Sequence, residues 1–398
     1  MLNAKPFAGI RKKIGSTRAD DIGRTVYCSC LCVLILVYNA GYTFADMMTP
    51  ALAGILSLVK YAVFALIVLN TAFISCELTV KDMLLIALCG AVIILSARGS
   101  RDTMLLTTFI VVVGSRLIPL KNIARTFLYV YIFILIGTVA LYLTGVIDEY
   151  TMVRGNGMIR HSLGFIHPNM LGLCILVIQL SFLMAFSGRI RPWGFLILSA
   201  ALAFFVYRVP NSRASLVCIV LGAFVPFIGG WKALRSRAAA VAASLIPWVI
   251  GAVSIVFTVI YDQNDPVMSL INRLSTGRIN LAHMMYQGAG YGGLFGSDRY
   301  LSLPDVYIDN AYCRLFLFFG IAAMILFLAW CSFGIYRNML GGSPAAALVL
   351  IVMAVYGFFE LHTLFAVFNP GLAAVLAAPE TGAINDDLKT NDRGEYRK

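Results

Sequence analysis

The sequence predicts an all-α, polytopic integral membrane protein. Hydrophobic residues make up 60% of its 398 residues and charged residues only 13%, which is typical of a chain whose main solvent is the bilayer. A membrane-spanning helix needs about 20 apolar residues, and eleven or twelve such stretches follow one another along the chain. We therefore expect one membrane domain of 11–12 transmembrane helices, with a long extracytoplasmic loop that contains short helices.

The expected spans divide evenly between the two halves of the chain. In the first half they are residues 26–44, 51–74, 83–97, 103–118, 124–147 and 169–187. In the second half they are residues 193–208, 214–230, 238–260, 310–335, 345–359 and 364–379. One helix over the last pair would be about 52 Å long against a hydrocarbon core of about 30 Å, so we expect a turn near Glu360. The first span lacks a convincing cleavage site, and we interpret it as a retained helix.

The distribution of basic residues predicts the orientation. If the basic arm at residues 1–25 is cytoplasmic, the segments on that side hold 20 of the 31 Lys and Arg residues. Residues 26–379 then form a single transmembrane domain with outer loops at 148–168 and 261–309, and residues 380–398 form a polar cytoplasmic tail. Because the inner cations are scattered through short turns, we attribute the net charge of +12 to topology and not to nucleic-acid binding.

All cations of the expected outer segments are arginines. They are Arg98, Arg101, Arg154, Arg160, Arg208, Arg213, Arg273, Arg278 and Arg299. The planar guanidinium fork is suited to gripping phosphate or carboxylate oxygens in a bidentate manner. The alternative is that these arginines only pair with acidic residues of the same loops.

The four histidines also fall on the outer side or at its edge. They are His161, His167, His283 and His362. Histidine is the usual general base near neutral pH, although a single interfacial histidine is more often a polar cap. Two of them lie in the stretch RHSLGFIHPN at 160–169, where Pro168 and Asn169 predict the start of a helix with the asparagine as its cap.

The second long outer loop contains a candidate anion site. STGRINLAHMMYQ at 275–287 is predicted to be a helix with a Ser or Thr cap and with Arg278 in its first turn, where backbone N–H groups and a guanidinium would converge on an anion such as pyrophosphate. GAGYGGLFG at 288–296 is not followed by Gly-Lys-Ser/Thr and is not preceded by a strand. We interpret it as a flexible hinge and not as a nucleotide loop.

Ionisable and amide side chains also gather at the expected outer ends of the last helices. They are Asp309, Asn310, Glu360, His362 and Asn369. Such groups are costly at membrane depth and are functional candidates by default, although Glu360 could instead form a structural pair with an arginine. No two of these His, Asp and Glu residues have a recognised metal-ligand spacing, so we expect neither a metal nor a cofactor.

The order of these motifs resembles a known superfamily. R-x-S-L-G-F-x-H-P-N-x-L-G (160–172) is followed by N-S-R-A-S (211–215), L-S-T-G-R (274–278), the pair Asp309-Asn310, and a late segment with Glu360 and Asn369-Pro370. This order, over residues 150–370, resembles the O-antigen ligase and polymerase superfamily. Within it, the chain is most similar to the Wzy-like polymerases of capsular and exopolysaccharides.

The resemblance implies a metal-independent membrane glycosyltransferase. Such an enzyme joins undecaprenyl-diphosphate-linked oligosaccharide repeat units on the outer face of the bacterial plasma membrane, for capsule, exopolysaccharide or O-antigen synthesis. By this resemblance Arg160, Arg213 and Arg278 would grip the diphosphate. Arg154 is a further candidate for that role, and Asn169, Asp309 and Asn310 are candidates for other substrate contacts. The general base stays open among His283, His167, His161 and Glu360.

The expected partners follow from the same resemblance. They are lipid-linked oligosaccharides as both donor and acceptor, membrane lipids, and flippase and chain-length regulator proteins, with no nucleic acid and with both termini in the cytoplasm. One alternative is an O-antigen ligase, which shares the donor chemistry and transfers the glycan to another acceptor. An alternative from another class is a transporter or flippase of lipid-linked sugars, which the lack of an internal repeat disfavours.

Overall fold

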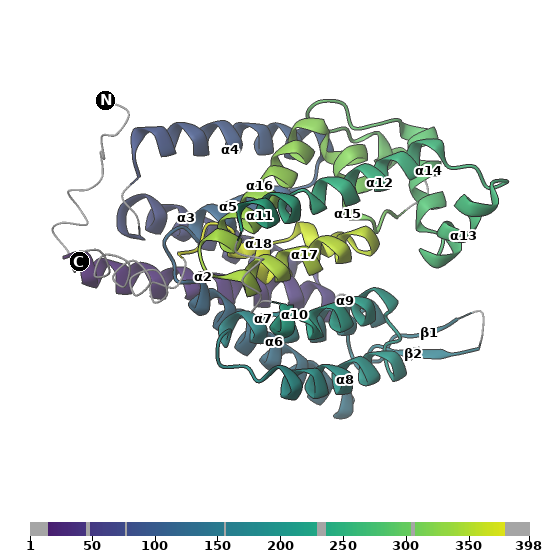
Figure 1. The fold of residues 1–398 in the computed structure, drawn as a ribbon, viewed down its shortest axis with the longest axis horizontal. Coiled ribbons are helices and arrows are strands. Elements are labelled where there is room, and N and C mark those ends of the chain that lie inside the picture. The colour runs from purple at the N-terminus through teal and green to yellow at the C-terminus, as the bar shows by residue number, and fades with distance from the viewer. Residues whose placement is uncertain are drawn as a thin grey trace, which may run out of the picture.

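The chain folds almost entirely into helices, as Figure 1 shows. The computed structural model describes residues 15–44, 48–75, 78–154, 157–228, 236–303 and 307–378. The expected cytoplasmic tail, most of the N-terminal arm, and Lys232 and Arg235 of an expected inner turn lie outside the described residues.

Seven helices in the described part of the chain are long and apolar enough to cross a membrane. They are α2 (Ser16–Thr43), α3 (Pro50–Asn70) with its π-helical extension η2 (Thr71–Ser75), α4 (Val80–Ser100), α6 (Leu120–Leu143), α7 (Pro168–Ala185), the pair α11 (Arg237–Ser244) and α12 (Ile246–Ile260), and α16 (Ile321–Leu340). Four shorter apolar helices are α5 (Met104–Gly114), α8 (Pro192–Arg208), α9 (Arg213–Ala223) with α10 (Val225–Ile228), and α17 (Pro344–Phe359). These helices fall on the first eleven expected spans, so the polytopic helical fold is confirmed. The first begins ten residues earlier than expected, inside the basic arm.

Local sequence explains where many of these helices begin. Proline occupies the first turn of α3, α7, α8, α12 and α17, a position where its missing N–H costs nothing and its fixed φ suits the helix. α4 begins with a capping box. The hydroxyl of Thr79 accepts from the N–H of Asp82, and the N–H of Thr79 donates to the Asp82 carboxylate, each at 3.1 Å.

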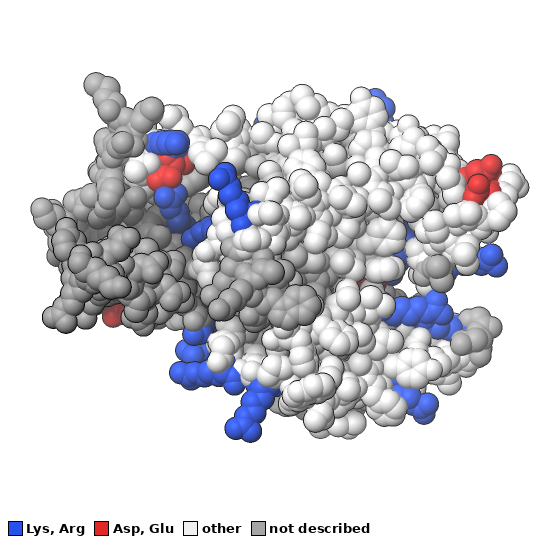
Figure 2. Space-filling model, viewed as in Figure 1, with Lys and Arg blue, Asp and Glu red and all other residues white. Residues whose placement is uncertain are grey.

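The outward faces of the helices are apolar. Large side chains such as Leu58, Leu88, Phe133 and Ile197 are 65–72% exposed, and Figure 2 shows charge mainly at the two ends of the molecule, with an uncharged band between them. A soluble monomer rarely exposes so much contiguous apolar surface. α7 instead lies inside the bundle, where it packs between α6 and α9. The exposed faces are therefore those expected to contact lipid.

The twelfth expected span, 364–379, is not a transmembrane helix. It forms part of the 3-10 turn η6 (Leu361–Leu364), the short α18 (Pro370–Ala373) and further turns, and nearly all of its described residues are buried. Irregular backbone is tolerated at membrane depth only where protein covers it. Apolar composition cannot distinguish a lipid-facing helix from a buried irregular segment of similar length. The turn expected near Glu360 is confirmed, because α17 ends at Phe359.

Neighbouring helices satisfy the backbone of this buried segment. The hydroxyl of Thr108 donates to the carbonyl of Leu364 at 2.6 Å, and the N–H of Ala378 donates to the carbonyl of Ile118 at 2.8 Å. The segment therefore runs from Glu360 back to the turn that joins α5 and α6. It crosses the bundle without continuous helical hydrogen bonding.

The expected span 310–335 is broken near its beginning. α15 (Ala311–Arg314) continues into a π-helical turn, η5 (Leu315–Phe319), and Gly320 then separates this turn from α16. Gly320 has a φ of 88°, a conformation that glycine adopts without strain. The spanning helix is therefore α16, which extends to Leu340.

The glycine loop, residues 288–296, packs against η5 and is not the flexible hinge that we expected. The N–H of Gly292 donates to the carbonyl of Phe316 at 3.0 Å. A Cβ atom on Gly292 would lie 2.8 Å from the carbonyl oxygen of Leu317. Glycine is needed here because two backbones are in contact, and the loop supplies a donor to a carbonyl of the π-helical turn.

The two long loops expected on the outer side lie at one end of the molecule. Residues 148–168 contain the hairpin of β1 (Thr151–Val153) and β2 (Ile159–His161). Residues 261–309 contain α13 (Pro266–Leu274), α14 (Arg278–Ala289) and the 3-10 turn η4 (Arg299–Ser302). Figure 1 shows the hairpin, α13 and α14 together on the right. The short helices expected in the second loop are therefore present.

Candidate functional site

The hairpin holds Arg160 in a buried position. β1 pairs antiparallel with β2, and Met152 lies opposite Arg160. Successive side chains of a strand point to opposite faces, so Ile159 is 52% exposed whereas Arg160 is only 6% exposed. The Nε atom of Arg160 donates to the carbonyl of Pro210 at 2.8 Å. The guanidinium is thus fixed beside the turn that joins α8 and α9.

α7 begins at Pro168 as expected, but its cap is His167 and not Asn169. The Nδ1 atom of His167 accepts from the backbone N–H of Asn169 at 3.0 Å. Asn169 is already inside the first turn, so its side chain is not used as the cap and can contact residues outside α7. Its Oδ1 atom accepts from Nη2 of Arg160, and its Nδ2 atom donates to Oε1 of Glu360 at 2.7 Å. One amide, with a donor and an acceptor, therefore bridges a cation and a carboxylate.

α14 begins at Arg278, which confirms its place in the first turn. The expected Ser or Thr cap is absent, because Gly277 has a φ of 85° and the hydroxyl of Thr276 donates to the carbonyl of Ser275. The Arg278 side chain is 13% exposed and turns toward two carboxylates. Its Nε atom donates to Asp309 at 3.0 Å and its Nη2 atom donates to Glu360 at 2.7 Å.

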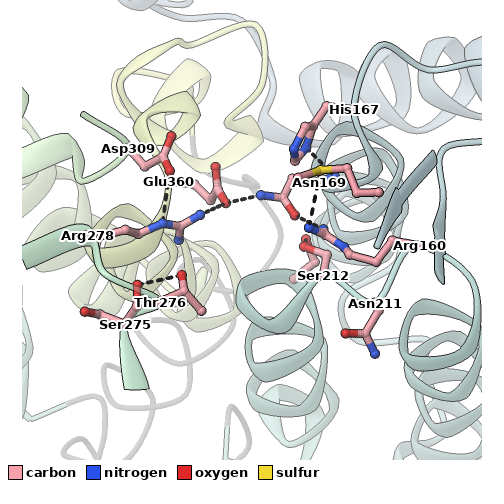
Figure 3. Close-up of polar contacts among 12 residues, drawn as sticks. Arg160, His167, Asn169, Asn211, Ser212, Ser275, Thr276, Arg278, Asp309 and Glu360 are labelled. Atoms are coloured by element: carbon pink, nitrogen blue, oxygen red, sulfur yellow. Dashed lines mark hydrogen bonds and ion pairs between the residues drawn. The ribbon is translucent and has the colours of Figure 1, made fainter. Parts of the chain in front are cut away.

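Glu360 joins these two halves of the site, as Figure 3 shows. It follows the last residue of α17 in an extended conformation, and its side chain is 4% exposed. Oε1 accepts from both Arg278 and Asn169, so segments far apart in the sequence meet at one atom. The resulting polar chain contains Asp309, Arg278, Glu360, Asn169 and Arg160. Such a network is strong in the low dielectric of a protein interior, because each hydrogen-bond donor in it is paired with an acceptor of the next residue.

Burial and neighbouring charge set the protonation of the site. Burial, opposed by the charge of Arg278 and assisted by the Asp309 carboxylate, raises the pKa of Glu360 to about 7. Burial lowers the pKa of His167 to about 4, and Arg160 and Arg278 add to that effect. Burial likewise lowers the pKa of Arg160 to about 10. At neutral pH the arginine is therefore cationic, the histidine is neutral and Glu360 is close to its midpoint.

Four arginines line one cavity beside this network. Arg154, Arg160, Arg213 and Arg278 surround a space of about 470 Å³ that also contacts Glu360. The Nη2 atom of Arg154 donates to the carbonyl of Asn211 at 2.8 Å, and Arg213, the first residue of α9, is exposed. The pKa of Arg154 is lowered by burial and by the charges of Arg213 and Arg278. This arginine cavity therefore concentrates positive charge suited to a polyanionic group.

A second cavity meets the first at Asn169 and Glu360. It encloses about 660 Å³, and its lining is aromatic and acidic. The side chains that characterise it are Tyr42, Tyr150, Tyr307, His167, His362, Asp148, Glu149, Asp309 and Glu360. We call it the tyrosine cavity. The site thus has two compartments of opposite character, and Glu360 lines both.

The chain was compared with protein-family models, with curated proteins and with solved structures. None of the three comparisons gave a match.

Three of the expected site residues have other contacts. The Nδ1 atom of His283 lies 2.8 Å from the carbonyl of Thr258, which is the geometry of a donated hydrogen bond. The Nδ1 atom of His161 lies 3.0 Å from the Glu149 carboxylate. The side chain of Asn310 caps α15, where its Oδ1 atom accepts from two backbone N–H groups. None of the three lines the arginine cavity or the tyrosine cavity.

The sequence reasoning found Asp309 and Glu360 but missed Asp148, Glu149 and the tyrosines of the tyrosine cavity as functional candidates. Glu149 accepts from the N–H of Leu163 at 3.2 Å and contacts His161, and Tyr150 follows it directly. A signal was available, because Asp148 and Glu149 immediately follow an apolar span, where ionisable groups are functional candidates. Tyr42 gave no such signal, since an aromatic residue near a helix end is ordinary in a membrane protein.

Proposed function

We propose that the protein is a polysaccharide polymerase, a glycosyltransferase that joins lipid-diphosphate-linked oligosaccharides at the outer face of the bacterial plasma membrane. The observation that carries the proposal is the convergence of four guanidinium groups on one cavity together with a buried carboxylate. The motif order that resembles the O-antigen ligase and polymerase superfamily agrees with it. So does the surrounding bundle of apolar helices, which suits a substrate carried on a lipid.

Each part of the reaction has a candidate group in the site. An acceptor hydroxyl oxygen forms a bond to the anomeric carbon of the donor, and the bond from that carbon to the diphosphate oxygen breaks. The hydroxyl proton passes to the carboxylate of Glu360, and the electron pair leaves with the lipid diphosphate. The arginines stabilise the negative charge that develops on the leaving group.

Glu360 fits the role of general base better than the histidines do. Among the hydrogen bonds of the described residues, both contacts to Glu360 are made by Oε1, so Oε2 remains for a substrate proton. A pKa of about 7 is suited to proton transfer near neutral pH. His167 uses Nδ1 as a helix cap, and His283 does not line either cavity. We therefore assign the base role to Glu360.

Arg213→Ala is the variant that tests the diphosphate grip. Arg213 is exposed and belongs to none of the ion pairs of the described residues, so its loss should leave the fold intact. Removing one donor to a developing anion should lower the polymerisation rate by about 10- to 100-fold. Product chain length on gels and the pool of lipid-linked repeats are the measurements. Long polymer should be lost while lipid-linked single repeats accumulate on the outer face.

Arg208→Ala is the matched control. Arg208 ends α8 near the same end of the bundle, is exposed, and does not line the arginine cavity, so its loss should leave polymer length unchanged. Accumulation of lipid-linked repeats on the inner face in the Arg213 variant would indicate a flippase and would overturn the proposal. Long polymer that is made but not attached to its final carrier would indicate a ligase.

A further inference from the structure

The tyrosine cavity differs in charge from the arginine cavity that it adjoins. Its lining includes Asp148, Glu149, Asp309 and Glu360 and contains no lysine or arginine among the described residues. Among the described residues, the arginine cavity is lined by four arginines and by Glu360 as its only carboxylate. A diphosphate would therefore be attracted to one compartment and repelled by the other. The two cavities suit different parts of a reaction that has two substrates.

The aromatic side chains of the tyrosine cavity suit a sugar. Tyr42, Tyr150 and Tyr307 line it, and Tyr150 and Tyr307 are 50% and 57% exposed. An aromatic ring offers an apolar face together with a polar hydroxyl group. A pyranose has the complementary form, with C–H bonds on its faces and hydroxyl groups around its edge. Carboxylates such as Asp148 can accept hydrogen bonds from those hydroxyl groups.

His362 provides an independent sign of a ligand. It lines the tyrosine cavity and is 8% exposed, and neither ring nitrogen has a hydrogen-bond partner within the described structure. The rings of Tyr42 and Phe368 contact it edge-on, with centroids 5.5 Å and 5.3 Å away, and these contacts supply no acceptor. A buried polar side chain without a partner calls for an explanation. A ligand hydroxyl group in the adjoining cavity would supply one once the imidazole ring turns toward it, because both nitrogens are buried in this structure.

The geometry points to the tyrosine cavity as the acceptor site, which binds the uncharged, hydroxyl-rich sugar at the end of the acceptor glycan. This inference rests on the proposed function, and it adds the class of sugar that the site accepts. The donor diphosphate occupies the arginine cavity, and the acceptor hydroxyl reaches Glu360 from the opposite compartment. A uronic acid or another anionic sugar is disfavoured, because Asp148 and Glu149 form no ion pair with a lysine or arginine among the described residues, whereas Asp309 and Glu360 are both paired with Arg278.

Binding measurements on the full-length protein in nanodiscs separate the two compartments without requiring turnover. The probes are farnesyl diphosphate and the repeat-unit oligosaccharide released by mild acid from the cell's own lipid-linked pool. Tyr150→Ala removes an exposed ring, and His362→Phe keeps a ring but removes both nitrogens. Each should weaken oligosaccharide binding by about 5-fold or more, the loss of one hydrogen bond or ring contact. Neither should change the affinity for farnesyl diphosphate.

Arg213→Ala is the reciprocal variant, because it lines only the arginine cavity. It should weaken farnesyl diphosphate binding and leave oligosaccharide binding unchanged. If Tyr150→Ala and His362→Phe both bind the oligosaccharide normally, the inference is wrong. It is also wrong if the natural acceptor glycan ends in an anionic sugar.

The outcomes distinguish this inference from the proposed function. If Arg213→Ala accumulates lipid-linked repeats on the inner face and the tyrosine-cavity variants still lose oligosaccharide binding, the polymerase proposal fails and a sugar site remains. If Arg213→Ala loses polymer and the tyrosine-cavity variants bind the oligosaccharide normally, the polymerase proposal stands and the acceptor site lies elsewhere.

Discussion

Glu360 is the residue on which the site depends most. Its carboxylate is almost fully buried and is paired with Arg278 at 2.7 Å. Removing one partner of such a pair is strongly destabilising, because it leaves the other charge buried without compensation. Arg278 is therefore both a structural counter-charge and a proposed phosphate ligand. This dual role is why Arg213, and not Arg278, is the informative substitution for the diphosphate grip.

The protonation of Glu360 predicts the pH dependence of the reaction. A general base must be ionised to accept a proton. Since burial raises the pKa of Glu360 to about 7, the transfer rate should fall as the pH drops below 7, by about 10-fold per unit. It should level off above that pH. The pH profile of single-turnover transfer in detergent is the measurement.

Glu360→Gln provides the control for this profile. It should lower the rate by about 100- to 10,000-fold, the usual contribution of a general base, and the remaining activity should no longer fall below pH 7. His167, whose pKa burial lowers to about 4, stays neutral throughout this range and cannot cause the change. An unaltered acid limb in the Gln variant would show that another group is the base.

At the scale of elements, the glycine loop and the π-helical turn η5 depend on each other. A π-helical turn interrupts the regular helical hydrogen bonding, and the glycine loop donates to the carbonyl of Phe316 from Gly292. Beyond η5, the N–H of Ile321 donates to the carbonyl of Gly293 at 3.0 Å. The contact is close enough that side chains are excluded at several positions. The end of α14, the helix that begins at Arg278, is thereby attached to the transmembrane bundle.

Gly320→Ala should disrupt this contact. Gly320 has a φ of 88°, and an added Cβ would clash with the backbone nitrogen of Gly296. Backbone strain and overpacking together should destabilise the protein by ~2–4 kcal/mol. Thermal unfolding in detergent is the measurement.

Gly290→Ala is the matched control for Gly320→Ala. Its φ is 71°, but an added Cβ would have no neighbour within 4 Å. Its ψ is −160°, so like Gly320 it occupies a region that is almost restricted to glycine, and only this backbone cost of ~1–3 kcal/mol applies. Equal shifts in the thermal unfolding midpoint for the two variants would show that the contact between the glycine loop and Gly320 contributes little to stability.

At the scale of the whole molecule, both cavities lie at one end of an apolar bundle. The hairpin that holds Arg160 and the beginning of α14, where Arg278 lies, are at this end in Figure 1. Figure 2 shows basic side chains beside the notch between these parts. The opposite end contains the ion pair of Arg116 with Asp82 at 2.9 Å. Both cavities therefore lie at the end of the bundle opposite this ion pair.

Cysteine labelling should establish which end faces outward. Arg208 and Arg125 are both exposed, and the expected topology places Arg208 on the outer side of the membrane and Arg125 on the cytoplasmic side. Arg208→Cys should therefore react with a membrane-impermeant maleimide in intact spheroplasts. Arg125→Cys should react only after the membrane is permeabilised. The unsubstituted protein measures the background from its own cysteines. The reverse pattern would place both cavities in the cytoplasm and contradict the proposed function.

Much of the architecture was predictable from local sequence. A lipid-facing helix must be apolar along its whole length, so hydropathy located eleven helices, and proline in first turns marked where several begin. Arg160, Arg278 and Glu360 could be recognised as functional candidates for a related reason. A charged residue is costly in such a chain and is retained where it has an ion-pair partner or a function. The same reasoning was wrong for residues 364–379, where protein and not lipid surrounds an apolar segment.

The sequence alone determined that this chain spans a membrane and which few polar stretches interrupt its apolar helices. Only the tertiary structure decided which of these polar residues meet. Asn169 and Glu360 are 191 positions apart, and no local pattern encodes their contact at 2.7 Å. The same holds for the histidines, since packing places His167 and His362 beside the cavities and His161 and His283 elsewhere. Spacing along a helix fixes which face a side chain occupies, but the packing of helices against one another fixes what lies opposite.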